Sequence, residues 1–423
     1  MNKVLLALLA LAAALTVALP GAFARTEAAA KPEAVPGVTN RSIKIGGTFP
    51  FSGPVSAYAP IARGMEAYFK YINARRDKRT GQRGVYGRQI IFKQYDDGYN
   101  AAQAVQLTNK LVLEDKVFAV VASLGTEVNL AIRPMLNQRK IPQVNVLTGA
   151  SFWGTEYKKY PWTIGWVLDY VAEANMLAKW ILANTARQKI AIFYQNDHYG
   201  KDYLRGIKAG LGAAGRARIV SERSYEVTDA SYASQIVAQR QSGADTWVLF
   251  TTAGTPTVRA LATAARIGWK PDQIVINGVA ATDQVMAAAA QQTGAAFLNG
   301  TASTGYLKNP TNPKYRNDSA IRTYRRIMAN YGPDDINIRN TFYYTGIACA
   351  SDFVKLLYAA GKNLTREGLR RAYEKMNWVN PYLLAGSRVK TGKGDHFPID
   401  QGKIVRYNNG TYSEEGRLLD GRR

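Results

Sequence analysis

The chain has 423 residues, of which 47% are hydrophobic, and a formal net charge of +24. This length predicts at least two domains, and this composition is typical of a soluble globular protein. The positive charge is compatible with nucleic-acid binding or with attraction to an anionic envelope surface. The densest basic run, residues 73–88, looks like a solvated loop and has no recognition-helix, zinc-ligand or aromatic-basic pattern, so we expect no nucleic-acid partner.

The first 24 residues have the pattern of a secretory signal peptide. Lys3 precedes an apolar run over residues 4–19, and a small-x-small cleavage pattern ends at Ala24. The run is slightly short for a membrane span, although an uncleaved anchor is the alternative. Residues 25–41 are rich in Ala, Pro and Glu and predict a flexible tether. We therefore expect an exported protein, located in the periplasm or at the cell surface.

Strand and helix patterns alternate after the tether. In the first series, strands are predicted at residues 43–49, 88–97, 117–123 and 142–146, and helices at 62–73, at 101–115 and between the last two strands. A second series begins after Asp169, with alternating patterns at 189–195, 203–215, 218–226, 232–241, 246–252, 257–268 and 273–278. Two long helices are expected within 315–332 and 341–361, followed by a strand-like tail from 382 to 423. Such alternation predicts an α/β protein with parallel sheets covered by helices, and two series suggest two lobes.

Two predicted strands end in turns of small and hydroxyl-bearing residues. One strand ends before Thr126, and the next ends before Gly149, Ala150 and Ser151. Ligands of open parallel sheets bind beyond the carboxyl ends of the strands, where helix N-termini offer free N–H groups. Simple helix capping by the two hydroxyls is the alternative at either turn. Because successive strands end in this way, we expect a shared binding site for an anionic ligand group.

Several other patterns do not support a catalytic or cofactor site. The G-x-G-x-x-G match at residues 210–215 lies at the end of a predicted helix rather than between strand and helix. His198 is interpreted as a turn or cleft-edge residue, since spacing supplies no partners for a metal site or a hydrolase. The carboxylates of Asp96 and Asp97 are expected to cap a helix, and Cys349 to be a buried apolar residue. The sequence therefore predicts a protein that is not an enzyme, with no cofactor and no metal.

Six segments in order are similar to the periplasmic Leu/Ile/Val-binding protein family. They lie at residues 43–60, 95–112, 120–126, 148–151, 190–202 and 245–268, and the similarity extends from Ile43 to about Tyr407. The resemblance implies a type I periplasmic binding protein, with two Rossmann-like lobes joined by a three-strand hinge. It places lobe I at 42–166 and 306–382, and lobe II at 167–305 and 383–423. It also implies a monomer that captures a small solute and delivers it to an ABC permease of the inner membrane; a ligand-sensing regulatory domain of the same fold is the alternative.

The resemblance also implies a set of binding residues. The carboxylate-binding hydroxyls of the family match Thr126 and Ser151, and two family tyrosines match Tyr58 at the cleft mouth and Tyr199 on the second lobe. The full predicted set consists of Tyr58, Gly125, Thr126, Gly149, Ala150, Ser151, Tyr199, Thr252, Ala280 and Asp283.

One departure from the family pattern concerns the ligand. Amino-acid binders place a glutamate after the strand that matches residues 273–278, to hold the ligand ammonium. Here Gly278, Val279 and Ala280 stand in that turn, and the nearby Asp283 is displaced along the chain. A carboxylate-bearing amide or aromatic acid therefore becomes an alternative to a branched-chain or hydrophobic amino acid.

Overall fold

The computed structural model describes residues 35–184 and 189–421. The predicted signal peptide and residues 25–34 of the predicted tether lie outside this part of the chain. Within it, no helix has both the length and the apolar character needed to cross a membrane. The basic run at residues 73–88 forms the end of a helix and an irregular, largely exposed loop, as predicted.

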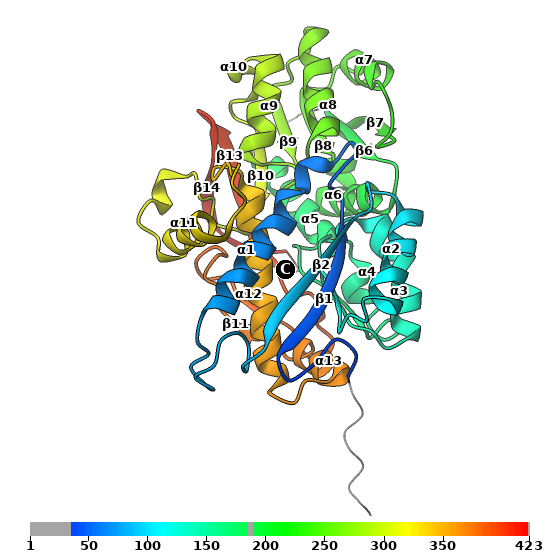
Figure 1. Ribbon diagram of the computed structural model, residues 1–423. Coiled ribbons are helices and arrows are strands. Elements are labelled where there is room, and N and C mark those ends of the chain that lie inside the picture. The colour runs from blue at the N-terminus through cyan, green and yellow to red at the C-terminus, as the bar shows by residue number, and fades with distance from the viewer. Residues whose placement is uncertain (1–34, 185–188, 422–423) are drawn as a thin grey trace, which may run out of the picture. The chain divides into compact units, whose positions relative to one another are not determined.

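The strands in the described residues form two main sheets (Figure 1). The first sheet contains β1 (Ser42–Phe49), β2 (Gln89–Asp96), β3 (Val120–Val121), β4 (Gln143–Val146) and β5 (Thr163–Gly165). The second contains β6 (Ile190–Gln195), β7 (Ile219–Tyr225), β8 (Thr246–Phe250), β9 (Gln273–Ile276), β10 (Ala302–Gly305), β13 (Gln401–Asn408) and β14 (Thr411–Asp420). A small third sheet pairs β11 (Asn377–Trp378) with β12 (Val389–Lys390).

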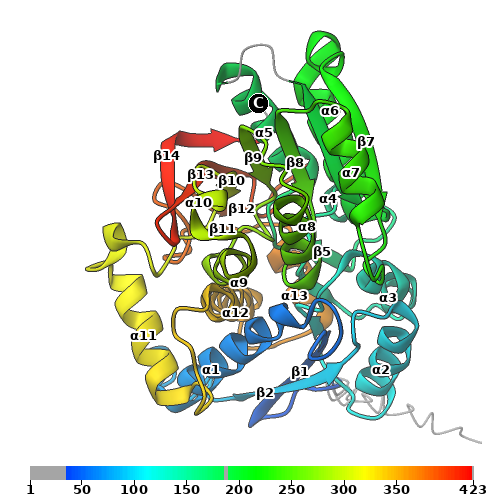
Figure 2. The same cartoon turned by 90° about the horizontal axis from the view of Figure 1, so that it is seen from above.

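Helices connect the strands. They are α1 (Pro60–Ala74), α2 (Ala101–Leu113), α3 (Thr126–Gln138), α4 (Phe152–Thr155), α5 (Tyr170–Asn184), α6 (His198–Arg216), α7 (Ala233–Gln241), α8 (Thr255–Arg266), α9 (Asp283–Thr293), α10 (Ala295–Leu298), α11 (Ser319–Tyr331), α12 (Thr341–Ala360) and α13 (Arg366–Tyr373). Two short 3₁₀ helices are η1 (Ser56–Tyr58) and η2 (Pro313–Tyr315). Figure 2 shows α8 and α9 side by side over the second sheet.

The strand orders place many carboxyl ends at common edges. The first sheet has the order β2-β1-β3-β4-β5 and is parallel throughout. The second has the order β14-β13-β10-β9-β8-β6-β7 and is parallel from β10 to β7. The two remaining strands, β13 and β14, run antiparallel and extend this sheet into a mixed one. The predicted α/β fold is thus confirmed, and the strand-like tail forms a hairpin at the edge of the second sheet.

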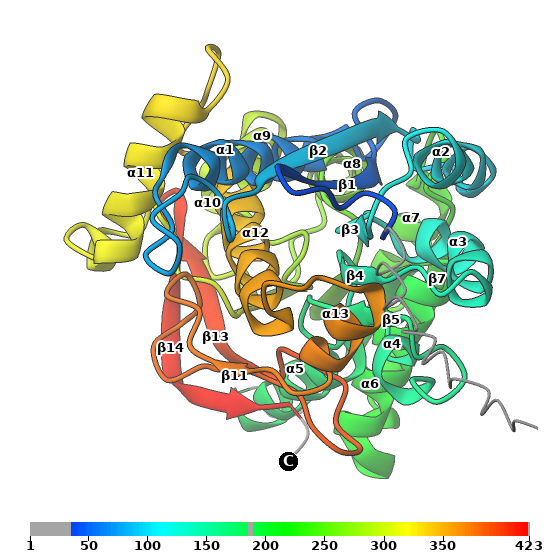
Figure 3. The ribbon, with the colours of Figure 1, turned by 60° about the horizontal axis from the view of Figure 1, so that its bottom comes forward.

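The chain passes between the two sheets three times in the described residues, after β5, after β10 and before β13. The strands of the two main sheets fall within the lobes that the sequence predicts for them, whereas β11 and β12 pair across the predicted boundary at residues 382 and 383. The lobe boundaries themselves stay a prediction. Helix α12 packs against α1 (Figure 3), and a Cβ at Gly64 would lie 2.2 Å from the carbonyl oxygen of Tyr343. Glycine at this position therefore allows the two helices to approach closely.

A buried carboxylate fastens two of the crossover segments to α12. Asp352 is fully buried and accepts hydrogen bonds from the indole nitrogens of Trp166 and Trp378, at 2.8 Å each, and from Nδ2 of Asn380 at 2.7 Å. Burial raises the pKa of Asp352, while the three donors oppose that shift. This side chain therefore ties together the segments before and after lobe II at the hinge.

Candidate functional site

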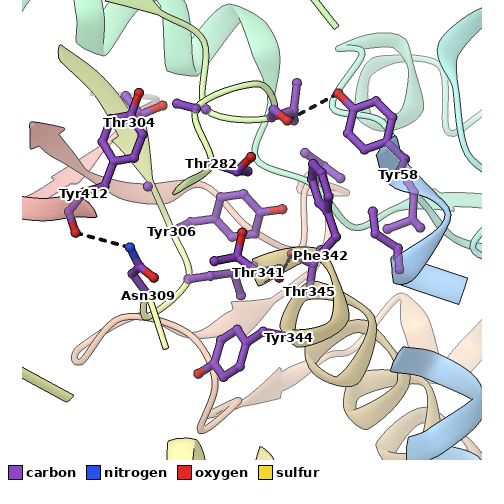
Figure 4. Close-up of a pocket in the computed structure, with 18 of the residues that line it drawn as sticks. Tyr58, Thr282, Thr304, Tyr306, Asn309, Thr341, Phe342, Tyr344, Thr345 and Tyr412 are labelled. Atoms are coloured by element: carbon purple, nitrogen blue, oxygen red, sulfur yellow. Dashed lines mark hydrogen bonds between the residues drawn. The ribbon is translucent and has the colours of Figure 1, made fainter. Parts of the chain in front are cut away.

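A cavity of about 150 Å³ lies where the strand ends of the two sheets face each other. Residues that follow β1 to β5 line it on one side, and residues that follow β6, β8, β9 and β10 line it on the other. The N-terminal turn of α12 and the hairpin strands β13 and β14 complete the wall (Figure 4). The predicted location of the site, beyond the carboxyl ends of parallel strands, matches this cavity.

Two threonine hydroxyls form the polar centre of the first wall. Thr126 starts α3 and Thr148 follows β4, and their Oγ1 atoms are 2.6 Å apart. Each side chain is 1% exposed, and both residues line the cavity. The first N–H groups of an α-helix have no acceptor within the helix. Thr126 thus combines a buried hydroxyl with the positively polarised end of α3.

Gly125 is required for this arrangement. Its φ angle is +107°, and a Cβ at this position would lie 2.6 Å from the ring of Tyr99. Any other residue would strain the backbone and displace Tyr99, which also lines the cavity. The predicted small residue is therefore in the wall, and its small size makes room for an aromatic ring of the protein.

The prediction for Ser151 requires a correction, because the structure places this residue away from the cavity lining. Its N–H donates to Oδ2 of Asp202 at 2.7 Å, and its Oγ accepts from Arg205 at 2.6 Å. Both partners lie on α6, so the hydroxyl that we expected to bind a ligand carboxylate, and the N–H beside it, already have protein partners. The hydroxyl next to Thr126 is that of Thr148, three residues earlier. Nothing in this geometry supports a direct ligand contact for Ser151.

Three further predicted residues serve packing. Gly149 lies against the first crossover, where an added Cβ would be 2.1 Å from the carbonyl oxygen of Leu168. Ala150 and Ala280 are buried in hydrophobic clusters, at 1% and 0% exposure. None of the three is part of the cavity lining. Small residues in these turns therefore reflect close packing of the chain, which local sequence cannot distinguish from room for a ligand.

Tyr58 and Tyr199 line the cavity, but their hydroxyls have protein partners. The hydroxyl of Tyr58, on the first lobe, donates to the carbonyl of Val279 at 3.3 Å and accepts from the N–H of Ala253 at 3.0 Å. The hydroxyl of Tyr199 donates to the carbonyl of Thr251 at 2.7 Å and accepts from Asn277. Tyr58 thereby joins the two lobes.

A second contact between the lobes involves His198 at the start of α6. The ring Nδ1 of His198 lies 2.8 Å from Oε1 of Glu127 on α3, and the backbone N–H of His198 donates to the same oxygen at 2.9 Å. Together with the Tyr58 and Ser151 contacts, this shows the lobes closed upon each other. His198 thus begins α6, directly after the turn that follows β6.

Asp283 also lines the cavity, although neutral donors surround its carboxylate. It accepts from the N–H of Tyr412 at 3.0 Å, from Oγ1 of Thr411 at 2.9 Å, from Asn309 at 3.1 Å and from Thr311. These contacts fasten β14 and the segment after β10 to the start of α9. The oxygens are therefore not free to hold a ligand ammonium.

Several residues of the wall were not predicted. Tyr170 and Tyr306, which come from the first and second crossovers, line the cavity without having been predicted, whereas the predicted residue Thr252 lines it as well. Burial raises the pKa of both tyrosines, so their hydroxyls are neutral donors. Nothing in the local sequence indicates which crossover residues face the cleft, because that depends on how the lobes meet.

The carboxylates of Asp96 and Asp97 hold loops rather than capping the next helix. Asp96 accepts from the N–H groups of Phe51 and Gly98, at 2.9 and 3.0 Å, and Asp97 accepts from the N–H of Tyr99 at 2.9 Å. Asn100 caps α2 instead. In the described part of the chain, no group of three or more His, Cys, Asp or Glu residues has the arrangement of a metal site.

A buried glutamate supports the turn in which the family glutamate is missing. Glu173 on α5 is 2% exposed; its Oε1 accepts from the N–H of Gly278 at 2.6 Å, and its Oε2 accepts from the hydroxyl of Tyr203 at 2.8 Å. Burial raises the pKa of Glu173 to about 7. This carboxyl group thus holds the backbone of Gly278, which lines the cavity, although Glu173 itself is not part of the lining.

We expect Glu173 to make folding stability depend on pH. Because its pKa is raised in the folded state, folding favours the protonated form; this contribution is complete below pH 4.5 and is lost as the pH rises through 7. The expected loss in unfolding free energy is about 3 kcal/mol. Urea unfolding of the wild type and of Glu173→Gln at pH 5 and pH 8 measures it. The variant should lose less stability than the wild type over this range, and an identical loss in both proteins would contradict the assignment.

The sequence profile of the periplasmic binding protein family matches residues 42–411. The chain therefore belongs to this family, whose members are binding proteins rather than enzymes. Both the predicted family and the predicted non-enzymatic character are confirmed.

Two relatives are Leu/Ile/Val-binding protein homologs from Brucella. Homolog 3 of Brucella melitensis is 25% identical over 208 residues, which cover 48% of this chain and 52% of the relative. Homolog 7 of Brucella abortus is 27% identical over 246 residues, covering 56% and 58%. The chain thus spans about half the length of the curated relatives it matches.

Solved structures agree in fold. A branched-chain amino acid ABC transporter protein from Thermus thermophilus with bound valine has a TM-score of 0.76 at 19% identity, over 90% of this chain and 97% of that one. A solute-binding protein of an ABC transporter from R. palustris, in complex with 4-hydroxybenzoate, has a TM-score of 0.72 at 18% identity with the same coverage. At these identities the similarity shows the fold alone.

Proposed function

We propose that this protein is an exported, monomeric solute-binding protein that captures a small carboxylate-bearing solute and delivers it to an ABC permease of the inner membrane. The observation that carries the proposal is the Thr126–Thr148 hydroxyl pair at the start of α3, inside a cavity closed by both lobes. Hydroxyl hydrogens rotate, so both groups can turn from each other and donate to one carboxylate. The lobes close around the ligand by a hinge motion.

The magnitudes support this mechanism. Hydrogen bonds to a charged group contribute about 1.5–3 kcal/mol each, and a helix N-terminus adds about 0.3–2 kcal/mol. Micromolar affinity requires about 8 kcal/mol net, so two hydroxyls, the helix end and burial of an apolar group are sufficient. An apolar cavity of roughly 150 Å³ is large enough to bind benzene. The cavity volume of about 150 Å³ therefore accommodates a small organic solute.

The wall favours an acid without an amino group. The carboxylates that line the cavity are Asp283, which is saturated with neutral donors, and Glu414, which pairs with Lys314 and Lys403 at 2.8 and 3.4 Å. A ligand ammonium would have no free acceptor among them, and burying an unpaired charge is costly. We therefore favour an amide-bearing, aliphatic or aromatic acid over an α-amino acid.

Matched ligand pairs test this proposal. The mature chain is screened by thermal shift against leucine and 4-methylpentanoate, and against phenylalanine and 3-phenylpropanoate, at neutral pH. A ligand that binds only the native state raises the melting temperature. We expect the acids without an amino group to give the larger shifts. Larger shifts with the amino acids would refute the assigned ligand class, and no shift with any carboxylate would refute the carboxylate site.

A further inference from the structure

The cavity continues past the strand ends toward the hinge. We define its strand-end compartment by Tyr58, Thr126, Thr148 and Thr252, and its hinge-side compartment by Tyr306, Asn309, Phe342, Tyr344 and Tyr412. Figure 4 shows Tyr58 and Tyr412 at opposite sides of the pocket, with Tyr306 and Phe342 between them. Because these residues line one continuous cavity, a single ligand can extend between the compartments.

The topology of the second sheet gives this cavity an elongated form. Thr252 follows β8 and Tyr412 lies on β14, and the strands β9, β10 and β13 stand between them. Four interstrand steps of about 4.8 Å separate the two backbones by about 19 Å before side chains fill part of the distance. A cavity of about 150 Å³ drawn out along such a path suits a linear ligand better than a round one.

The hinge-side compartment contains an unused hydrogen-bonding group. Tyr412 is 4% exposed, and its hydroxyl has no hydrogen-bond partner among the described residues. Figure 4 shows its ring pointing toward Thr304, which also lines the cavity. The Tyr412 N–H donates to Asp283, which holds the backbone from which the ring projects, and the ring packs 5.1 Å from that of Tyr407. A buried hydroxyl without a partner destabilises the protein, and a ligand group that bonds to it removes that cost.

The charges around this compartment limit the identity of that group. Asp283 and Glu414 are both carboxylates of the wall, and Lys308 is paired with Asp318 at 2.8 Å. A second carboxylate on the ligand would approach the uncompensated negative charge of Asp283. A ligand ammonium would find the oxygens of Asp283 already occupied by other donors. An uncharged hydroxyl or amide matches the surroundings best.

We propose that the natural ligand is a linear acid with an uncharged hydroxyl or amide at its far end, its carboxylate at Thr126 and Thr148 and its far group at the Tyr412 hydroxyl. This inference rests on the proposed function, because it takes the carboxylate site as given. It adds a second recognition point at the far end of the same cavity.

A series of acids with the same six-carbon chain and different end groups tests the second recognition point. Dissociation constants are measured by calorimetry for hexanoate, 6-hydroxyhexanoate, adipate monoamide and adipate. We expect the hydroxy and monoamide acids to bind about three- to tenfold more tightly than hexanoate, as one added neutral hydrogen bond predicts. Adipate should bind more weakly than either. Equal affinity for hexanoate and both substituted acids, or tightest binding of adipate, would overturn the proposal.

Two substitutions separate this inference from the proposed function. Tyr412→Phe removes only an unpartnered hydroxyl and should abolish the advantage of 6-hydroxyhexanoate over hexanoate. Tyr407→Phe is the matched control, since this ring lies 5.1 Å from Tyr412 on the neighbouring strand but does not line the cavity. Thr126→Val should weaken all four acids. If Thr126→Val has this effect but Tyr412→Phe does not change the preference, the inference fails and the proposed function stands; if no acid binds the wild type, both fail.

Discussion

Replacing Thr126 and Thr148 together with valine is expected to weaken binding of a carboxylate ligand by at least a hundredfold, with little change in folding stability. Valine keeps the shape of threonine and removes the hydroxyl. Two hydrogen bonds to a charged group contribute about 3–6 kcal/mol together, which corresponds to a factor of more than a hundred. The folded protein should tolerate the double change, because Thr126 and Thr148 bond to each other and replacing both partners by apolar groups is nearly neutral.

Calorimetric titration of the best ligand from the thermal-shift screen measures this effect, with urea unfolding as the test of stability. Thr263→Val is a matched control, since this buried threonine bonds to the carbonyl of Arg259 within α8. Ser151→Ala compares the two strand-end turns and should reduce affinity only several-fold, by loosening a contact with α6. A larger loss of affinity with Ser151→Ala than with the threonine pair would show that the anion binds at Ser151, as the sequence predicts, rather than at Thr148.

Asp352→Asn is expected to lower the free energy of unfolding by about 3 kcal/mol or more. The carboxylate receives three buried N–H donors, from Trp166, Trp378 and Asn380. An asparagine amide would turn its own N–H₂ group toward at least one of them, leaving buried donors without acceptors. The residue holds two crossover segments, so the loss concerns the hinge as well as the core of lobe I.

The midpoint of urea unfolding measures this change. Asp272→Asn, on an exposed position before β9, removes the same charge and should shift the midpoint little. Similar midpoints for the two variants would show that the three donors find other acceptors. Asp352 would then not be the residue that stabilises the hinge.

The sequence predicts the alternation of the elements better than their pairing. The long helices α1 and α12 lie where their apolar periodicity indicates. The strand predicted at residues 117–123 is reduced to Val120–Val121, and the regular strand ends before Ala122, whose φ is +59°. The antiparallel hairpin of β13 and β14 cannot be read from local patterns, since its place beside β10 is a contact between distant segments.

Some residues of the candidate site can likewise be predicted from local sequence, and others cannot. Strand ends are local features, and they led to Gly125 and Thr126 in the cavity wall. The choice between Thr148 and Ser151 depends on Asp202, a residue of the opposite lobe. Tyr412 enters the wall only because the chain returns to lobe II at its last strand. Contacts between distant segments decide these positions, and a single amino-acid sequence does not reveal such contacts.

The packing of α12 on α1 also has a consequence for biogenesis. Gly346 meets the backbone of Ile61, and almost 300 residues separate them in the chain. A nascent polypeptide that has emerged only as far as β10 lacks the helix that shields α1 and the adjoining sheet. Such long-range closure slows folding and leaves apolar surface uncovered for longer. Acquisition of the native state should therefore be slow and sensitive to holdase chaperones until α12 has docked.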